Sequence, residues 1–425
     1  MRTFTFKGLF LTAVFTLLGC LSIQAADDDL ITKQITIKLD EAGTLPDKIG
    51  SSEKYKITNL KIVGEINGTD WKMIREMAGR DYENNITAGK LSMLDLSEAK
   101  IVEGGDSYNI GTKDGQDVHN SYTSNDEIGE FAFYGCSGLT SLNLPAGITT
   151  IGSRAFQNCT GLTSLTLPAS LTTIGNCAFY RCSGLTSLIL PTGISTIGTR
   201  AFHGCSGLTS LTLPASIITI GSSAFYGCSG LTSLNLPASI TTIGSNAFYR
   251  CSGLTSLTLP ASITTIGSSA FYGCSGLTSL TLPAGITEIG AYAFYGCSGL
   301  TSLNLPAGIT TIGIAAFRGC SGLTSIYVYA EKVPGIGSYA FEECDAKKCT
   351  VYVPKGTYDD YRFSEFGYFE NIVEFDATGI DKTTTSTDVK EVSRYSVNGQ
   401  RLVGPTKGLN IVKYSDGSVK KVAVR

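Results

Sequence analysis

Apolar residues recur along the middle of this chain with a period of 23 residues, separated by small and polar positions. The repeated unit reads Ile-Gly-x-x-Ala-Phe-x-x-Cys-Ser-Gly-Leu-Thr-Ser-Leu-x-Leu-Pro-Ala-x-Ile-Thr-Thr. Its copies begin at Ile128, Ile151, Ile174, Ile197, Ile220, Ile243, Ile266, Ile289 and Ile312, with a degenerate copy at Ile336. Units of this size cannot bury their own apolar face, so they stack on one another as a solenoid. The pattern therefore predicts a right-handed solenoid over residues 128–358 with one short parallel strand per repeat.

The first repeat allows single positions to be assigned to sides of the coil. Leu142-Asn143-Leu144 is predicted to form the strand, with both leucines inward and Asn143 outward, because neighbouring side chains of a strand point to opposite faces. Pro145 ends the pairing because it has no N–H group to donate. Ala132-Phe133 is expected to begin one helical turn, and Cys136 is expected to point inward. Stacked repeats should then share a core of Leu, Ile, Phe and Cys ladders.

Residues 26–127 lack the regular 23-residue period but contain segments that resemble parts of the repeat. We interpret them as an N-terminal cap with degenerate repeats. Three segments resemble the core strand, at residues 35–39, 60–62 and 94–96. Asp70–Met77 suits a short helix. Residues 103–127 are rich in Gly, Asp, Asn and Ser and predict a loop. A calcium site at Asp114 and Asp117 is the alternative, but that spacing matches no known calcium loop, which favours a solvated loop.

Beyond the last repeat, the pattern decays into a cap and a tail. Thr350–Pro354 is predicted as a last strand. Residues 359–376 are interpreted as a C-terminal cap because of their apolar bulk, which comes from Tyr361, Phe363, Phe366, Tyr368 and Phe369. Residues 377–388 form a linker by composition. Residues 389–425 alternate like small strands and predict a β tail, with turn signals at Asn398-Gly399 and Asp416-Gly417.

The N-terminal residues 1–25 predict an export signal. Arg2 and Lys7 precede an apolar run that is too short to span a bilayer as a permanent helix. Two processing routes remain open. Cleavage after Ala25 would release a soluble chain, whereas Leu17–Cys20 resembles a bacterial lipobox, in which Cys20 would carry a lipid. No later segment is long and apolar enough to be transmembrane.

Charge is sparse in this chain. Charged residues make up 16% of it, and the formal net charge is −3. A nucleic-acid partner would require a basic face, and the repeats offer none. The composition therefore excludes nucleic-acid binding as the expected function.

Ten of the 13 cysteines recur once per repeat, at Cys136, Cys159, Cys182, Cys205, Cys228, Cys251, Cys274, Cys297, Cys320 and Cys344. Stacked coils hold equivalent side chains parallel and roughly 4.8 Å apart, whereas a disulfide needs converging Cβ atoms ~3.8 Å apart. We therefore predict a buried ladder of free thiols. Cys177 and Cys349 lie outside the ladder, and their state is left open. There is no CxxC pair, and His119 and His203 stand apart, so no metal site and no cofactor are expected.

The phrase Ala-Phe-x-x-Cys-Ser-Gly-Leu-Thr-Ser-Leu-x-Leu-Pro, with Ile-x-x-Ile-Gly, closely resembles the BspA-like leucine-rich repeat from residue 128 to about residue 375. Leu60–Gly68 and Lys90–Ser97 look like the front caps of Bacteroides-type members. The resemblance implies an extracytoplasmic protein of a Gram-negative bacterium, secreted or on the cell surface or outer membrane. It also implies adhesion to host-cell or matrix proteins.

The tail is similar to the C-terminal sorting domains of type IX secretion, over Tyr395–Leu402 and Lys420–Arg425. It is shorter than those domains, and a lipobox would imply a different route. Any membrane attachment is therefore expected only through a lipid anchor or this tail.

Neutral hydroxyls and amides line the predicted strand face, at Ser141, Asn143, Ser164, Thr166, Ser187, Ser210, Thr212, Ser233, Asn235, Ser256, Thr258, Ser279, Thr281, Ser302 and Asn304, with Ile189 as the apolar exception. Such a face could hydrogen-bond a glycan or a peptide backbone. The alternative is plain solubility combined with the strand propensity of Thr.

Two groups of tyrosines interrupt this polar pattern. Near the C-terminal end the face changes to Tyr327, Tyr329 and Tyr352, which could form a binding hot spot or pack under the cap. A second stripe, expected on the convex side, follows each Phe at Tyr134, Tyr180, Tyr226, Tyr249, Tyr272 and Tyr295. We interpret this stripe as stacked rings that shield the core rather than as a ligand site.

The sequence therefore predicts that the chain is a non-enzymatic binding or adhesion protein. No Ser/His/Asp set, phosphate loop or metal cluster occurs, and near-identical repeats offer the same few side chains at every step. Glycan binding and a structural role in a surface layer or self-assembly are the alternatives.

Overall fold

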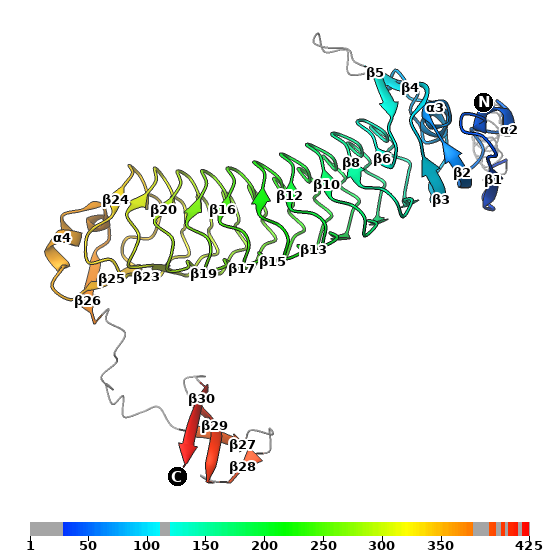
Figure 1. Ribbon diagram of the computed structural model, residues 1–425. Coiled ribbons are helices and arrows are strands. Elements are labelled where there is room, and N and C mark those ends of the chain that lie inside the picture. Colours follow the sequence, from blue (N-terminus) through cyan, green and yellow to red (C-terminus); the bar gives the residue numbers. More distant parts are fainter. Residues whose placement is uncertain are drawn as a thin grey trace, which may run out of the picture. The chain divides into compact units, whose positions relative to one another are not determined.

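The repeat region folds as a parallel β-solenoid, as the period predicts (Figure 1). The computed structural model describes residues 29–110, 120–376, 391–396, 401–403, 407–414 and 419–424. The chain forms two compact units, of which the first ends at Phe375 and the second begins at Asp376. Neighbouring coils pair in parallel at equivalent positions: Leu234 pairs with Leu257, and Leu257 with Leu280. The solenoid prediction requires parallel pairing between neighbouring repeats, and no antiparallel pairing occurs between the described repeats.

One ladder of strands carries the Leu-x-Leu positions along one side of the solenoid, which we call the strand face. Its strands are β1 (Ile35–Lys38), β2 (Asn59–Ile66), β3 (Met93–Ile101), β7 (Ser141–Asn143), β9 (Ser164–Thr166), β11 (Ser187–Ile189), β13 (Ser210–Thr212), β15 (Ser233–Asn235), β17 (Ser256–Thr258), β19 (Ser279–Thr281), β21 (Ser302–Leu305), β23 (Ser325–Val328), β25 (Thr350–Pro354) and β26 (Asn371–Phe375). Most repeat strands begin one residue earlier than predicted, at Ser141 rather than Leu142 in the first repeat. Pairing is continuous from β1 to β9, from β11 to β13 and from β15 to β26.

A second ladder runs along another side of the coil, so the prediction of one strand per repeat was wrong. Its strands are β6 (Glu127–Ile128), β8 (Thr150–Ile151), β10 (Thr173–Ile174), β12 (Thr196–Ile197), β14 (Thr219–Ile220), β16 (Thr242–Ile243), β18 (Thr265–Ile266), β20 (Glu288–Ile289), β22 (Thr311–Ile312) and β24 (Gly335–Ile336). These strands form one unbroken sheet. A strand of two residues is too short to show the alternation of apolar and polar residues that identifies a strand in a sequence. These strands form because neighbouring coils stack and pair with each other.

The Ala-Phe segment forms hydrogen-bonded turns instead of the predicted helical turn. Its N–H groups alternate between two kinds of partner. The Phe156 N–H donates to the Ala178 carbonyl of the next coil at 2.7 Å, whereas the Ala155 N–H donates to the Gly152 carbonyl of its own turn at 3.3 Å. The residue two positions before each Phe is left-handed, as at Arg154 with φ of 55°. That conformation prevents a regular α-helix.

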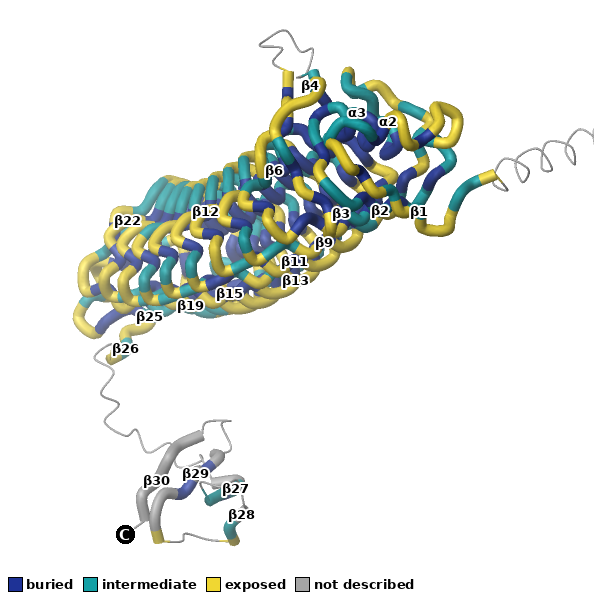
Figure 2. Tube along the Cα trace, turned by 45° about the vertical axis from the view of Figure 1, so that its right-hand side comes forward, coloured by how far each residue is buried: buried dark blue, intermediate teal, exposed yellow. Residues whose placement is uncertain are grey.

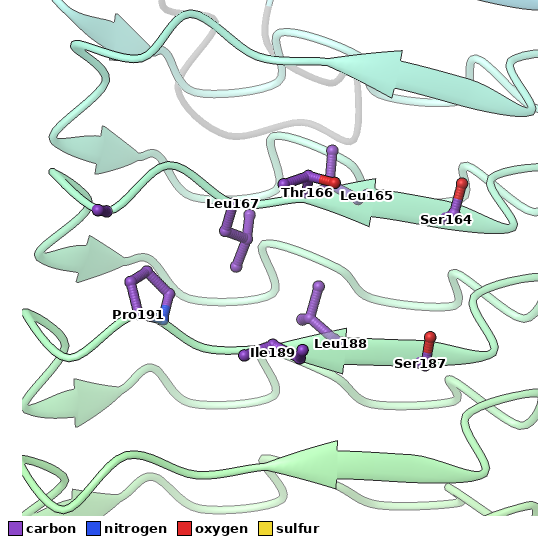
Figure 3. Close-up of a pocket in the computed structure, with 9 residues that line it drawn as sticks. Ser164, Leu165, Thr166, Leu167, Ser187, Leu188, Ile189 and Pro191 are labelled. Carbon is purple, nitrogen blue, oxygen red and sulfur yellow. The ribbon is translucent and has the colours of Figure 1, made fainter.

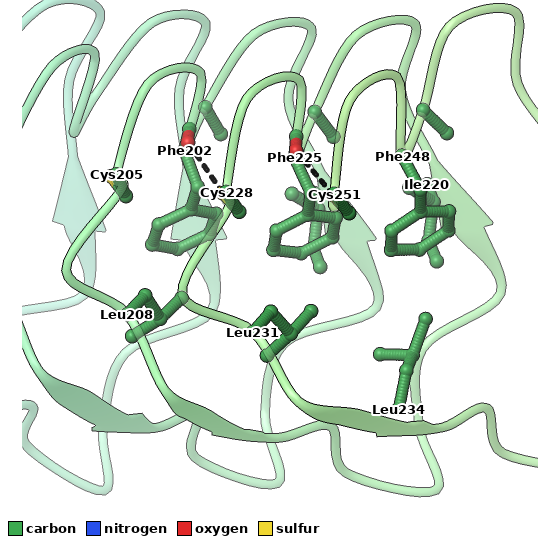
Figure 4. Packing of buried hydrophobic residues seen from close by; sticks show 14 of the residues in the cluster. Phe202, Cys205, Leu208, Ile220, Phe225, Cys228, Leu231, Leu234, Phe248 and Cys251 are labelled. Atoms are coloured by element: carbon green, nitrogen blue, oxygen red, sulfur yellow. Dashed lines mark hydrogen bonds between the residues drawn. The ribbon is translucent and has the colours of Figure 1, made fainter. Parts of the chain in front are cut away.

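Phenylalanine and cysteine ladders fill the core between the two sheets (Figure 4), and buried positions recur from coil to coil along the chain trace (Figure 2). The Phe rings stack in parallel, with centroids 5.3 Å apart between Phe202 and Phe225 and again between Phe225 and Phe248. Each ladder thiol from Cys159 onward lies against the carbonyl of the Phe one coil earlier, as Cys228 Sγ does at 3.2 Å from Phe202 O. The ladder cysteines are buried and free, as predicted. Burial in this apolar core raises the pKa of the Cys205 and Cys274 thiols to about 12.

Close stacking leaves no room for a side chain at the Gly of each Cys-Ser-Gly-Leu turn after the first. A Cβ atom on Gly207 would lie 2.2 Å from Ser183 O of the preceding coil, whereas one on Gly138, in the first repeat, would meet nothing within 4 Å. We expect Gly207→Ala to lower the free energy of unfolding by about 1–3 kcal/mol. Gly138→Ala should be neutral or stabilise by about 0.5 kcal/mol. Urea unfolding followed by circular dichroism measures both, and equal effects would contradict this packing.

The N-terminal cap continues the strand face through β1, β2 and β3, which confirms the predicted degenerate strands. Helix α3 (Gly68–Met77) covers the core, with its N-terminus closed by a capping box between Asn67 and Asp70, and a short helix α2 (Leu45–Lys48) precedes it. The loop predicted for residues 103–127 was wrong in part, because β4 (Gly104–Ile110) and β5 (Asn120–Thr123) form an antiparallel hairpin. The calcium alternative at Asp114 and Asp117 lies outside the described residues.

The cap also supplies hydrogen-bond donors to the first coil. In later coils, the carbonyls equivalent to those of Glu130 and Ala132 accept N–H groups from the coil before. In the first coil, Tyr108 Oη donates to Glu130 O at 3.0 Å, and Trp71 Nε1 donates to Ala132 O at 3.0 Å. Arg75 Nη1 adds a bond of 3.1 Å to Ala132 O. Side chains of the cap therefore close this edge of the solenoid.

The first unit ends in α4 (Tyr358–Arg362), a 3-10 helix (Glu365–Tyr368) and β26. Tyr361, Phe366 and Phe369 are buried against the last coil. The second unit is an antiparallel sheet made of β27 (Glu391–Ser396), β28 (Arg401–Leu402), β29 (Gly408–Tyr414) and β30 (Val419–Val424), in the order β28-β27-β29-β30. The predicted linker, residues 377–388, lies outside the described residues.

Candidate binding face

Parallel rows of polar side chains cover the strand face, because inward leucines alternate with outward positions along every strand. The predicted Ser, Thr and Asn residues are all exposed except Ser141 and Ser302, which are half-buried. Strict register places equivalent residues side by side, as Asn235 beside Thr258 and Thr258 beside Thr281. The result is an extended, uncharged surface of hydrogen-bonding groups.

The rows are interrupted between β9 and β11, where the hydrogen-bonded ladder is broken. An open pocket of about 420 Å³ lies there, and Figure 3 shows its lining of Leu165, Leu167, Leu188, Ile189 and Pro191 with hydroxyls from Ser164, Thr166 and Ser187. Ile189 is 73% exposed. It replaces the Asn or Thr that occupies this outward position in the other repeats up to Asn304.

Aromatic rings gather at the C-terminal end of the strand face, and we call this group the aromatic patch: Tyr327, Tyr329, Tyr352 and Phe375. The rings of Tyr327 and Tyr352 stack with centroids 4.4 Å apart. Phe375, from the unpredicted strand β26, meets Tyr327 and Tyr329 edge-on at 6.0 and 5.3 Å. The patch is partly covered by β26 and partly open, since Tyr327 and Tyr352 are half-buried and Tyr329 is exposed. Burial, reinforced by Tyr352, raises the pKa of Tyr327, so its phenol stays neutral near neutral pH.

The second tyrosine stripe lies on the turns that follow each core Phe and forms a continuous stack. His203 fills the gap in the stack between Tyr180 and Tyr226. Its ring centroid lies 4.6 Å from that of Tyr180 and 4.4 Å from that of Tyr226. Burial and the nearby guanidinium of Arg200 lower the pKa of His203. The rings are half-buried and cover each other's faces, which agrees with a shielding role. Tyr134 stands apart and packs edge-on against Phe131 at 5.6 Å.

The described residues offer few other groups that could bind a metal ion or carry out catalysis. They contain no group of three or more His, Cys, Asp or Glu side chains placed to hold a metal ion. No helix among them is both long and apolar enough to cross a bilayer. Cys20 and the export signal lie outside the described part of the chain. Most ion pairs among the described residues lie in the N-terminal cap, as between Lys100 and Glu65 at 3.0 Å, and others join residues near the last coil, such as Arg318 and Glu342.

Comparisons with known proteins match this chain to a repeat family and to leucine-rich repeat proteins. A family model described as BspA type leucine rich repeat region (6 copies) matches residues 126–255 and 241–369. A leucine-rich repeat protein from Bacteroides ovatus ATCC 8483 is 24% identical, with 70% of this chain and 88% of that chain covered, at a TM-score of 0.41. A leucine rich cell surface protein from Faecalibacterium prausnitzii A2-165 is 25% identical, covering 61% and 86%, at 0.35. A leucine-rich repeat protein of T. pallidum is 30% identical, covering 45% and 76%, at 0.32.

A search of curated proteins gave no match. The family model spans more than half of the 425 residues, and its repeat is the one that builds both ladders and the core. The chain therefore belongs to the BspA-type leucine-rich repeat family.

Proposed function

We propose that this chain is a non-enzymatic, extracytoplasmic binding protein that holds a host or matrix macromolecule along its strand face. The observation that carries the proposal is the aromatic patch at the end of long, uncharged polar rows. Tyrosines with an apolar body and a polar tip are enriched at interface hot spots. The rows beside them suit an extended partner, because they repeat the same hydrogen-bonding groups from coil to coil.

A location outside the cytoplasm is supported by two further observations. Residues 1–25 have the pattern of an export signal, and a similar protein from Faecalibacterium prausnitzii is described as a cell surface protein. Either a lipid on Cys20 or the β tail would then attach the chain to the membrane. A thiol ladder without disulfides does not oppose export, since parallel stacking holds the thiols in poor geometry for oxidation.

The absence of catalysis is part of the same proposal. Catalytic sites need different side chains converging on one point, and the strand face offers Ser, Asn and Thr at every step. Glycan binding is the second candidate, and the hydroxyl and amide rows beside Tyr327 favour it, because these groups can bond sugar hydroxyls.

Two parallel screens test the proposal with the full mature chain. One measures binding to a panel of purified extracellular-matrix proteins, and the other uses a glycan array. We expect saturable binding to at least one member of the protein panel. Binding to glycans alone would select the second candidate. A reproducible turnover activity that one substitution outside the core abolishes would contradict both.

A further inference from the structure

Backbone hydrogen bonds between the Ala-Phe segments of neighbouring coils all run in one direction along the solenoid. In each coil, three alternate N–H groups beside the core Phe donate to carbonyls of the next coil. The last complete set runs from Ala315 to Ser338 (3.0 Å), from Phe317 to Ala340 (2.8 Å) and from Gly319 to Glu342 (2.8 Å). This set recurs in every earlier repeat, so its geometry is a constant feature of the fold.

The final coil has the donors but no following coil. Its equivalent N–H groups belong to Tyr339, Phe341 and Glu343. Those of Tyr339 and Phe341 have no hydrogen-bond acceptor within the described part of the chain, whereas that of Glu343 lies against the Tyr368 hydroxyl. Because the earlier sets all point to the next coil, the two open N–H groups point to the C-terminal end. They form an open edge of the kind that accepts an added strand.

The opposite end of the solenoid shows that such an edge can be closed. There, side chains of Trp71, Arg75 and Tyr108 bond to the carbonyls of the first coil. At the C-terminal end, the rings of Phe366 and Phe369 pack on Phe341 at 5.0 and 5.5 Å but supply no acceptor. The C-terminal cap thus covers the apolar core and leaves the N–H groups of Tyr339 and Phe341 unpaired.

A small pocket and an excess of negative charge adjoin this edge. The pocket has a volume of about 190 Å³ and is lined by Tyr339, Ala340, Phe341, Glu342, Glu365 and Tyr368. Arg318 pairs with Glu342 at 3.0 Å and with Glu343 at 2.6 Å, so one guanidinium serves two carboxylates. Glu365 is exposed and has no ion-pair partner among the described residues. An anionic ligand would be repelled here, whereas neutral carbonyls and cationic side chains would be attracted.

We propose that the edge formed by Tyr339 and Phe341 binds an extended, basic peptide segment by strand addition. Carbonyls of the peptide accept the two N–H groups, and a Lys or Arg side chain enters the pocket and pairs with Glu365. This surface is separate from the strand face, so the inference stands apart from the proposed function.

Hydrogen exchange at single amides tests the proposal directly. The probes are two acetylated, amidated heptapeptides, Thr-Lys-Val-Arg-Val-Lys-Thr and its acidic counterpart Thr-Glu-Val-Glu-Val-Glu-Thr. In the free chain, the amides of Tyr339 and Phe341 should exchange at least about tenfold faster than those of Ala315 and Phe317. The basic peptide should slow them by at least about tenfold, and the acidic peptide should not.

Charge reversal at the pocket provides the matched variants. Glu365→Lys should weaken binding of the basic peptide by at least about tenfold, while Glu288→Lys, exposed in the second ladder, should leave it unchanged. Three results would overturn the proposal: slow amide exchange at Tyr339 and Phe341 in the free chain, equal binding of the two peptides, or no slowing of exchange at about 1 mM basic peptide. Slowing that depends on protein concentration without peptide would assign the edge to a second copy of the chain, and would overturn it as well.

Discussion

Raising the pH above about 9 is expected to unfold the repeat region progressively. Burial holds the pKa of most ladder thiols above the ordinary value, at about 12 for Cys205 and Cys274, whereas a thiol in an unfolded chain ionises near 8.5. The stability that each thiol contributes is therefore complete below about pH 8.5 and is lost as the pH rises towards the folded pKa. One thiol accounts for about 1.4 kcal/mol per pH unit, and the ladder thiols act together.

Urea unfolding from about pH 7 to about pH 10.5 measures the effect, because the slope counts the protons lost on unfolding. Between about pH 8.5 and 10, thiols dominate, since tyrosine and lysine ionise near 10 or above. Cys228→Ala, which removes one buried thiol of the ladder, should reduce the slope by about one proton. An unfolding midpoint that stays constant or rises over this range would show that the ladder thiols are not buried and protonated.

Truncating one ring in the middle of the phenylalanine ladder should cost more stability than any surface change. Phe225 is fully buried and stacks on Phe202 and Phe248 at 5.3 Å on each face. We expect Phe225→Ala to lower the free energy of unfolding by about 3–5 kcal/mol, through lost burial and the cavity left behind.

Tyr226→Ala is the matched control for that variant. Tyr226 also stacks on two neighbours, at 4.4 Å from His203 and 4.5 Å from Tyr249, but it is only half-buried. Its loss should be about 1–2 kcal/mol, because part of its surface already faces water. Calorimetry or urea unfolding compares the two, and equal losses would mean that the ladder is not the main apolar core.

The strand face could be predicted from the sequence because one period controls both the inward and the outward positions. The equal spacing of Leu142, Leu165 and Leu188 fixes the register, and the inward orientation of the cysteines follows from it. The short helix at Asp70–Met77 was also predictable, since it has a capping residue and an apolar stripe.

Elements made by contacts between distant segments were not predictable. The two-residue strands of the second ladder carry no pattern of their own, and they exist because each coil pairs with the next. The hairpin β4–β5 lies in a Gly- and Asp-rich segment, but Tyr108 is buried against Trp71 with ring centroids 6.3 Å apart. These tertiary contacts outweigh the loop composition.

The candidate site also has parts that the sequence could predict and parts that it could not. Tyr327, Tyr329 and Tyr352 were found because they break the polar rows. Phe375 was assigned to the cap, although the β-branched and aromatic residues of Asn371–Phe375 favour a strand and could have placed it beside them. The open row of amides at the last coil has no signal in the sequence, because it depends on what the C-terminal cap leaves unpaired.

Comparing the affinities of two double variants for the partner found in the screens tests the central claim most directly. One variant is Tyr327→Ser with Tyr352→Ser, in the aromatic patch. The other is Tyr249→Ser with Tyr272→Ser, a pair on the second stripe that also stacks at 4.4 Å. The first should weaken binding by at least about 2 kcal/mol, roughly thirtyfold in Kd, and the second should leave it unchanged. Unchanged affinity in the first, or an equal loss in both, would contradict binding through the aromatic end of the strand face.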